Sequence, residues 1–129
     1  MENTARSRLE TVRMAALHLH KVLLEALRLE HEREFGRVDN PAELLRLVAY
    51  DARFAWLRPL SRQLVAIDDQ LGIHGPDAAS VRADIERLLS EPAFEREYLE
   101  RLQSAPEVVL AHAALRRELL GLPLLAAGA

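Results

Sequence analysis

Five histidines are the side chains of this 129-residue sequence best suited to acid–base chemistry or metal binding near neutral pH. His18 and His20 diverge by about 200° on a helix, so the two rings cannot hold one ion. His31 lies roughly 16 Å beyond His20 along a helix axis, which is also too far. His112 falls on an apolar helical face, and Asp68 lies at the edge of another. One hypothesis is therefore a shared site, built from His20, His112 and Asp68 on three helices of a bundle.

The alternative interpretation is structural, because a histidine at the edge of a core commonly packs and forms one hydrogen bond. The sequence lacks the Glu-x-x-His pairs of di-iron bundles and the His-Glu-x-x-His motif of zinc proteases. Asp68 and Asp69 diverge by about 100° on a helix and cannot work alone as an acid–base pair. Ser61 has no histidine near it in the sequence, and we expect its hydroxyl to bond to the backbone near Pro59. The sequence thus favours a non-enzymatic protein with no catalytic residue, no metal centre and no cofactor.

The most distinctive segment is Phe54–Ser61, with the sequence FAWLRPLS, which contains the only tryptophan of the chain. Trp56, together with Phe54 and Tyr50, can line a ligand pocket. The alternative is that these aromatic side chains are the anchors of a helical core. Trp56 therefore joins His20, His112 and Asp68 as a candidate ligand-binding residue.

This segment, together with Leu17–Lys21 (LHLHK) and the pair Ile67-Asp68, resembles a family of small, uncharacterised bacterial helical proteins. The resemblance extends over most of the chain, and the Trp-Leu-Arg-Pro-Leu-Ser block is its most specific part. It implies an all-helical fold and a bacterial cytosolic origin. It assigns no functional residue.

The composition is that of an ordinary globular domain, with 50% apolar and 29% charged residues. A net charge of −3 argues against a nucleic-acid partner, because phosphate binding needs a concentrated basic surface. The absence of cysteine excludes disulfides and cysteine-bound zinc. The N-terminal residues lack an apolar signal core, and the longest apolar stretch is too short to cross a membrane. We expect a cytoplasmic protein without a membrane partner.

Apolar residues recur at helical spacing, and turn or capping residues separate the segments. The predicted helices cover residues 3–35, 41–51, 54–71, 77–89, 92–102 and 106–120. Asn40 and Asp77 are expected to cap helices, and Ser104 to begin a capping box. The helix around Pro59 must start within about one turn of the proline or kink there. We predict an all-α fold: one domain over residues 1–129, an antiparallel bundle of about five to six helices with a long first helix. Residues 119–129 form an apolar, partly ordered tail.

The first helix is apolar on two faces. Its main core face carries Leu9, Val12, Ala16, Leu19, Leu23, Leu27 and Phe35, whereas Val22 and Leu29 lie almost opposite, with Ala15 and Ala26 beside them. Such a helix is either central in the fold or shared with a second copy of the chain. We expect a non-enzymatic bundle that acts through protein–protein association, as a homodimer. The alternative is a small-molecule-binding or metal-binding bundle that uses the histidines and Asp68.

Overall fold

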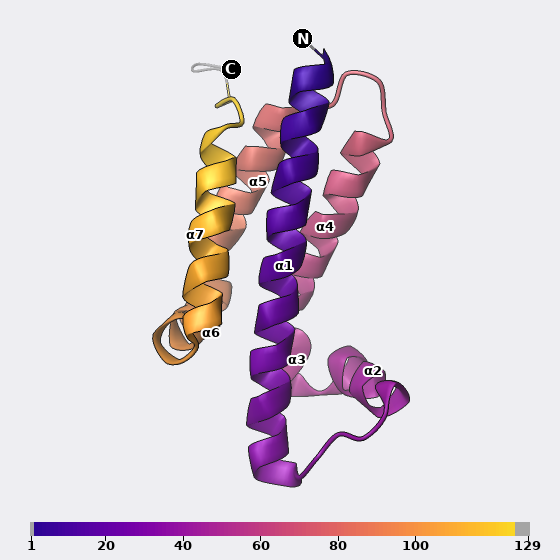
Figure 1. The fold of residues 1–129 in the computed structure, drawn as a ribbon, viewed down its shortest axis with the longest axis vertical. Helices are drawn as coiled ribbons and strands as arrows, with labels where there is room; N and C mark the ends of the chain where they lie inside the picture. Colours follow the sequence, from indigo (N-terminus) through magenta and orange to yellow (C-terminus); the bar gives the residue numbers. More distant parts are fainter. Residues whose placement is uncertain (1, 126–129) are drawn as a thin grey trace.

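The computed structural model describes residues 2–125, which form an all-helical bundle (Figure 1). Seven helices are found in this range: α1 (Glu2–Phe35), α2 (Pro41–Tyr50), α3 (Ala52–Ala55), α4 (Arg58–Leu71), α5 (Ala78–Leu89), α6 (Pro92–Ser104) and α7 (Pro106–Leu120). Helix α1 runs along the molecule, and α4 and α7 pack along it in the opposite direction. The predicted fold class is therefore confirmed. No strand occurs among the residues described.

The core follows the main apolar face of α1. Its residues Leu9, Val12, Ala16, Leu19, Leu23 and Leu27 are all buried, as their spacing predicts. Phe35 is the exception, because it is 66% exposed and its ring lies against His31 instead. The last turn of α1 extends past the start of α7, so no helix is there to cover this ring.

The segment around Pro59 accounts for the extra helix. The predicted continuous helix over residues 54–71 divides into the single turn α3 and the longer α4. Pro59 stands within the first two positions of α4, where its missing N–H costs no hydrogen bond. Phe54 and Leu57 are buried, so the short break between the two helices directs both side chains into the core.

Two of the three predicted caps are present. The Asn40 side chain accepts a hydrogen bond from the Glu43 N–H at 2.8 Å, and Asp77 accepts one from Ser80 at 3.0 Å. The capping box at Ser104 is wrong, because Ser104 is the last residue of α6. Pro106 opens α7, which makes the extended residue Ala105 its N-cap and leaves that position without a side-chain acceptor.

The C-terminal tail is partly fixed to the bundle. Leu119 and Leu122 are buried, and the carbonyl of Leu122 accepts a hydrogen bond from Arg82 at 2.7 Å. The carbonyl of Gly121 accepts another from Arg8 at 2.9 Å. The end of the predicted apolar tail, residues 126–129, lies outside the described residues.

Candidate functional site

His20 lies on α1 at the interface with α4. Its Nε2 atom is 2.8 Å from the Ser61 hydroxyl of α4. Two turns earlier on α1, Arg13 forms an ion pair with Asp68, which is two turns later on α4, as expected for antiparallel helices. The expected bond from Ser61 to the backbone near Pro59 is therefore wrong: the hydroxyl bonds to a histidine 41 positions away. Burial lowers the pKa of His20, so the ring is neutral at pH 7.

A serine bonded to a neutral histidine is the beginning of a nucleophilic site. Such a site also needs a group that orients the histidine through its second ring nitrogen. Within residues 2–125, His20 forms no such hydrogen bond. The Ser61–His20 pair therefore ties α4 to α1 and does not by itself form a catalytic unit.

His112 lies on α7 and contacts α6. Its Nδ1 atom is 2.6 Å from the Tyr98 hydroxyl, and the two rings are 5.4 Å apart. Burial, and secondarily the positive charge of Arg116, lowers the pKa of His112, while burial raises that of Tyr98. Both groups are neutral at pH 7, and both line a hollow of about 360 Å³ between α5, α6 and α7.

Asp68 is half exposed on α4, where Arg13 of α1 binds it at 2.5 Å. The three residues of the proposed shared site thus have three different partners: His20 has Ser61, His112 has Tyr98, and Asp68 has Arg13. Among the residues that the structure describes, no group of three His, Asp or Glu side chains is placed to hold a metal ion. The structure does not bring His20, His112 and Asp68 together.

Trp56 packs at the edge of the core. Its ring meets Phe94 edge-on at 5.2 Å, and the Arg101 guanidinium lies over it at 5.5 Å. Tyr50, which we grouped with it in the sequence, is 83% exposed and is not part of this cluster. Trp56 therefore packs α6 against the segment that precedes α4, and its role as a ligand-binding residue stays a prediction.

Arg101 is the residue that the sequence analysis missed. Only 6% of it is exposed, and its Nε and Nη2 atoms bind both carboxylate oxygens of Glu30 at 3.0 and 2.8 Å. Burial acts to lower the pKa of Arg101, but the hydrogen bond and the charge of Glu30 raise it above its ordinary value. A signal was present, because Phe94, Tyr98 and Arg101 follow the i, i+4, i+7 spacing of a buried stripe.

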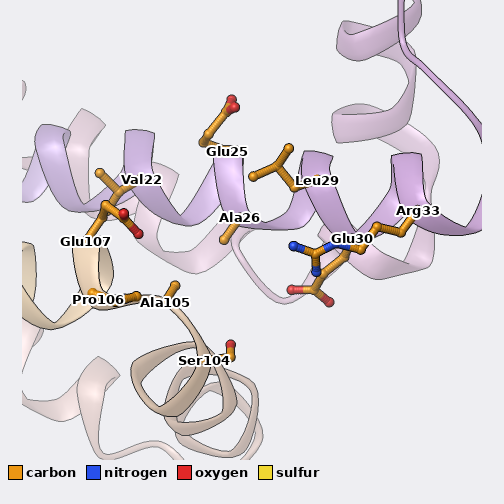
Figure 2. Close-up of a pocket in the computed structure, with 10 residues that line it drawn as sticks. All are labelled: Val22, Glu25, Ala26, Leu29, Glu30, Arg33, Ser104, Ala105, Pro106 and Glu107. Atoms are coloured by element: carbon orange, nitrogen blue, oxygen red, sulfur yellow. The ribbon is translucent and has the colours of Figure 1, made fainter.

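A second hollow, of about 380 Å³, lies on α1 beside the Glu30–Arg101 pair, where α6 turns into α7 (Figure 2). Its floor is the second apolar face of α1: Val22, Ala26 and Leu29. Its opposite wall is the turn that contains Ser104, Ala105 and Pro106. Upstream on this face, Ala15 packs against the core, as Val22 does, whereas Leu29 is 41% exposed. This face of α1 is thus covered in its upper part and open beyond the start of α7.

The charged side chains around this hollow differ in whether they are paired. Glu25 binds Arg28 at 3.0 Å, and Glu30 binds Arg101. Arg33 and Glu107 are exposed and have no ion partner among the side chains of residues 4–125. In Figure 2 Glu107 lies beside Val22, whereas Arg33 comes from the other end of the hollow and its guanidinium points back toward Glu30.

The chain matches no family model, no curated protein and no solved structure. Over the described residues, no helix has the length and apolar character needed to span a membrane. The geometry of the two hollows is therefore the basis for assigning a function.

Proposed function

We propose that this chain is a non-enzymatic helical bundle that acts through protein–protein association, as a homodimer. The observation that carries the proposal is the open part of the second apolar face of α1. There Leu29 is 41% exposed and Ala26 is half-buried, because α7 begins only at Pro106. A helix that stays apolar on a face without an internal partner is typical of an interface between subunits.

The shape of this surface favours a protein over a small molecule. The hollow is bounded by one long helix and one turn, and it is open to solvent along Leu29. A second helix fits along such a surface, and burying Leu29 against it adds about 1–2 kcal/mol per copy. Two-fold homodimers are the commonest protein assemblies, so a second copy is the simplest partner. We assign the dimer to the bacterial cytoplasm: the family resemblance supports the bacterial origin, and the lack of an apolar signal core and of disulfides supports the cytoplasm.

Sedimentation equilibrium of the purified chain tests this proposal. We expect twice the mass of one chain for the wild type and the mass of one chain for Leu29→Glu, which places a charge on the open face. Met14→Glu is the matched control, because Met14 is an exposed apolar residue (62%) on the same helix but outside the hollow. We expect it to remain dimeric.

Two results would contradict the proposal. A monomeric wild type at high micromolar concentration would exclude the homodimer. A dimer that survives Leu29→Glu would place the interface elsewhere, for example on the outer side of α7, where Leu110 is exposed.

A second candidate function is the binding of a small molecule beside His112. The supporting observation is the Tyr98–His112 pair at the wall of the 360 Å³ hollow, which also contains Glu95 and Arg116. A thermal-shift screen of metal ions and small metabolites, with His112→Phe as the comparison, tests it. A compound that stabilises the wild type and not the variant would support this function. A screen without such a compound would leave association as the better assignment.

A further inference from the structure

The second apolar face of α1 has a symmetric pattern of residues, half-buried at Val22 and Ala26 and exposed at Leu29 and Arg33. Val22, Ala26, Leu29 and Arg33 share one side of the helix and are separated by four, three and four positions. The order four, three, four is the same from either end, so the pattern is symmetric about a midpoint between residues 27 and 28. If two copies of α1 pack antiparallel about that midpoint, Ala26 faces Leu29 of the second copy, and Val22 faces Arg33.

The apolar part of this pattern suits close packing. Ala26 is small and Leu29 is large, so each leucine is received by the alanine of the other helix. The hollow between Ala26, Leu29 and the α6–α7 turn provides the space that each leucine needs. A two-fold contact of this kind is formed twice, once on each side of the axis.

The charges fit the same arrangement. Glu107 lies toward the Val22 end of the hollow, and Arg33 is eleven positions further along α1, about 16 Å away along the axis. Turning one copy around the midpoint brings its Arg33 to the Val22 end of the other copy, and therefore to Glu107. Arg33 and Glu107, which lack an ion partner among the side chains of residues 4–125, thus become complementary in the dimer.

We infer that the partner surface is a second copy of this chain, packed antiparallel through α1, with Leu29 on Ala26 and Arg33 paired with Glu107 across the two-fold axis. This inference rests on the proposed homodimer and specifies its register. Arg33 also lies in the last turn of α1 and Glu107 in the first turn of α7, positions that favour these charges within a single chain. That effect changes the stability of one chain and predicts no change in dimer affinity.

Charge reversal distinguishes the two explanations. We expect Arg33→Glu and Glu107→Arg each to raise the dimer dissociation constant about tenfold, because the two-fold axis converts two attractions into two repulsions. The double variant carries both reversals, so its charges are complementary again and its affinity returns to about that of the wild type. An equimolar mixture of the two single variants forms heterodimers for the same reason. Glu10→Arg, an exposed charge on α1 outside the hollow, is the control and leaves the affinity unchanged.

The measurement is sedimentation equilibrium at several concentrations, with circular dichroism to show that each variant is folded. Loss of affinity in both single variants and recovery in the double variant support the antiparallel register. A dimer whose affinity is unchanged by the reversals would overturn the register and leave the proposed homodimer standing. A wild-type chain that is monomeric throughout would overturn the homodimer, and the register with it.

Discussion

The buried Arg101–Glu30 pair makes the sharpest prediction about stability. Arg101→Ala removes a guanidinium that binds both oxygens of Glu30 and covers the ring of Trp56. Glu97 and Glu100 also lie within 3.5 Å of it, so the substitution leaves three carboxylates without their shared cation. We expect a large loss of stability from this single change.

The magnitude follows from burial. Removing one partner of a buried ion pair costs about 3–5 kcal/mol, because the remaining charge is left uncompensated. The Glu30 side chain keeps 30% of its exposure, so water partly replaces the lost partner and the cost lies at the lower end of that range. Lost packing of the arginine stem on Trp56 adds to it. We therefore expect Arg101→Ala to lower the free energy of unfolding by about 3 kcal/mol.

Urea denaturation, followed by the fluorescence of the single tryptophan and by circular dichroism, measures this cost. Glu30→Gln keeps an acceptor for Arg101 and costs less, about 1–2 kcal/mol. Arg96→Ala on the exposed side of the same helix is the control and stays within about 0.5 kcal/mol of the wild type. A cost below about 1 kcal/mol for Arg101→Ala, the range of surface ion pairs, would refute this account of the core.

Two further predictions concern pH and the end of α1. Burial lowers the pKa of His20 and of His112, so below about pH 6.5 the unfolded chain binds more protons than the folded one. The urea concentration at the unfolding midpoint therefore falls as the pH drops from 7.5 toward 5.5. The fall is smaller in a variant with both histidines replaced by Gln. A midpoint that does not change with pH would contradict this prediction. Gly36 ends α1 with a φ of 91°, which an L side chain adopts only with strain. Gly36→Ala should lower the melting temperature at a cost of about 1 kcal/mol, and an unchanged melting temperature would contradict that assignment.

The helical pattern of the sequence predicts most of the fold, because helix periodicity and capping are local signals. The core face of α1 and the caps at Asn40 and Asp77 are correct for that reason. The predicted cap at Ser104 is wrong because α7 starts at Pro106, which makes Ala105 and not Ser104 the N-cap. The predicted burial of Phe35 is wrong because periodicity does not reveal that the end of α1 extends beyond the neighbouring helices.

The candidate site depends on contacts between helices, which no local pattern encodes. The bond between His20 and Ser61 joins residues 41 positions apart, and it depends on the register of α4 against α1. Periodicity places Arg101 in a buried stripe, yet only the packed structure shows that Glu30 lies opposite to neutralise it. The resemblance to a bacterial helical family stays a prediction, since no family model matches the chain. Part of the second apolar face of α1 is covered within the bundle, on the side of α7. The part that stays exposed is the surface that we assign to a second copy of the chain.

Distances between spin labels across the dimer test this central assignment most directly. The chain has no cysteine, so a cysteine introduced at Lys21 or at Met14 carries one label per chain. In an antiparallel pair centred between residues 27 and 28, the axial separation of two equivalent labels grows by about 3 Å per position from the centre. We therefore predict an axial offset of about 20 Å at Lys21 and about 40 Å at Met14. Equal distances at both positions, or no dipolar coupling between chains at either, would contradict the account.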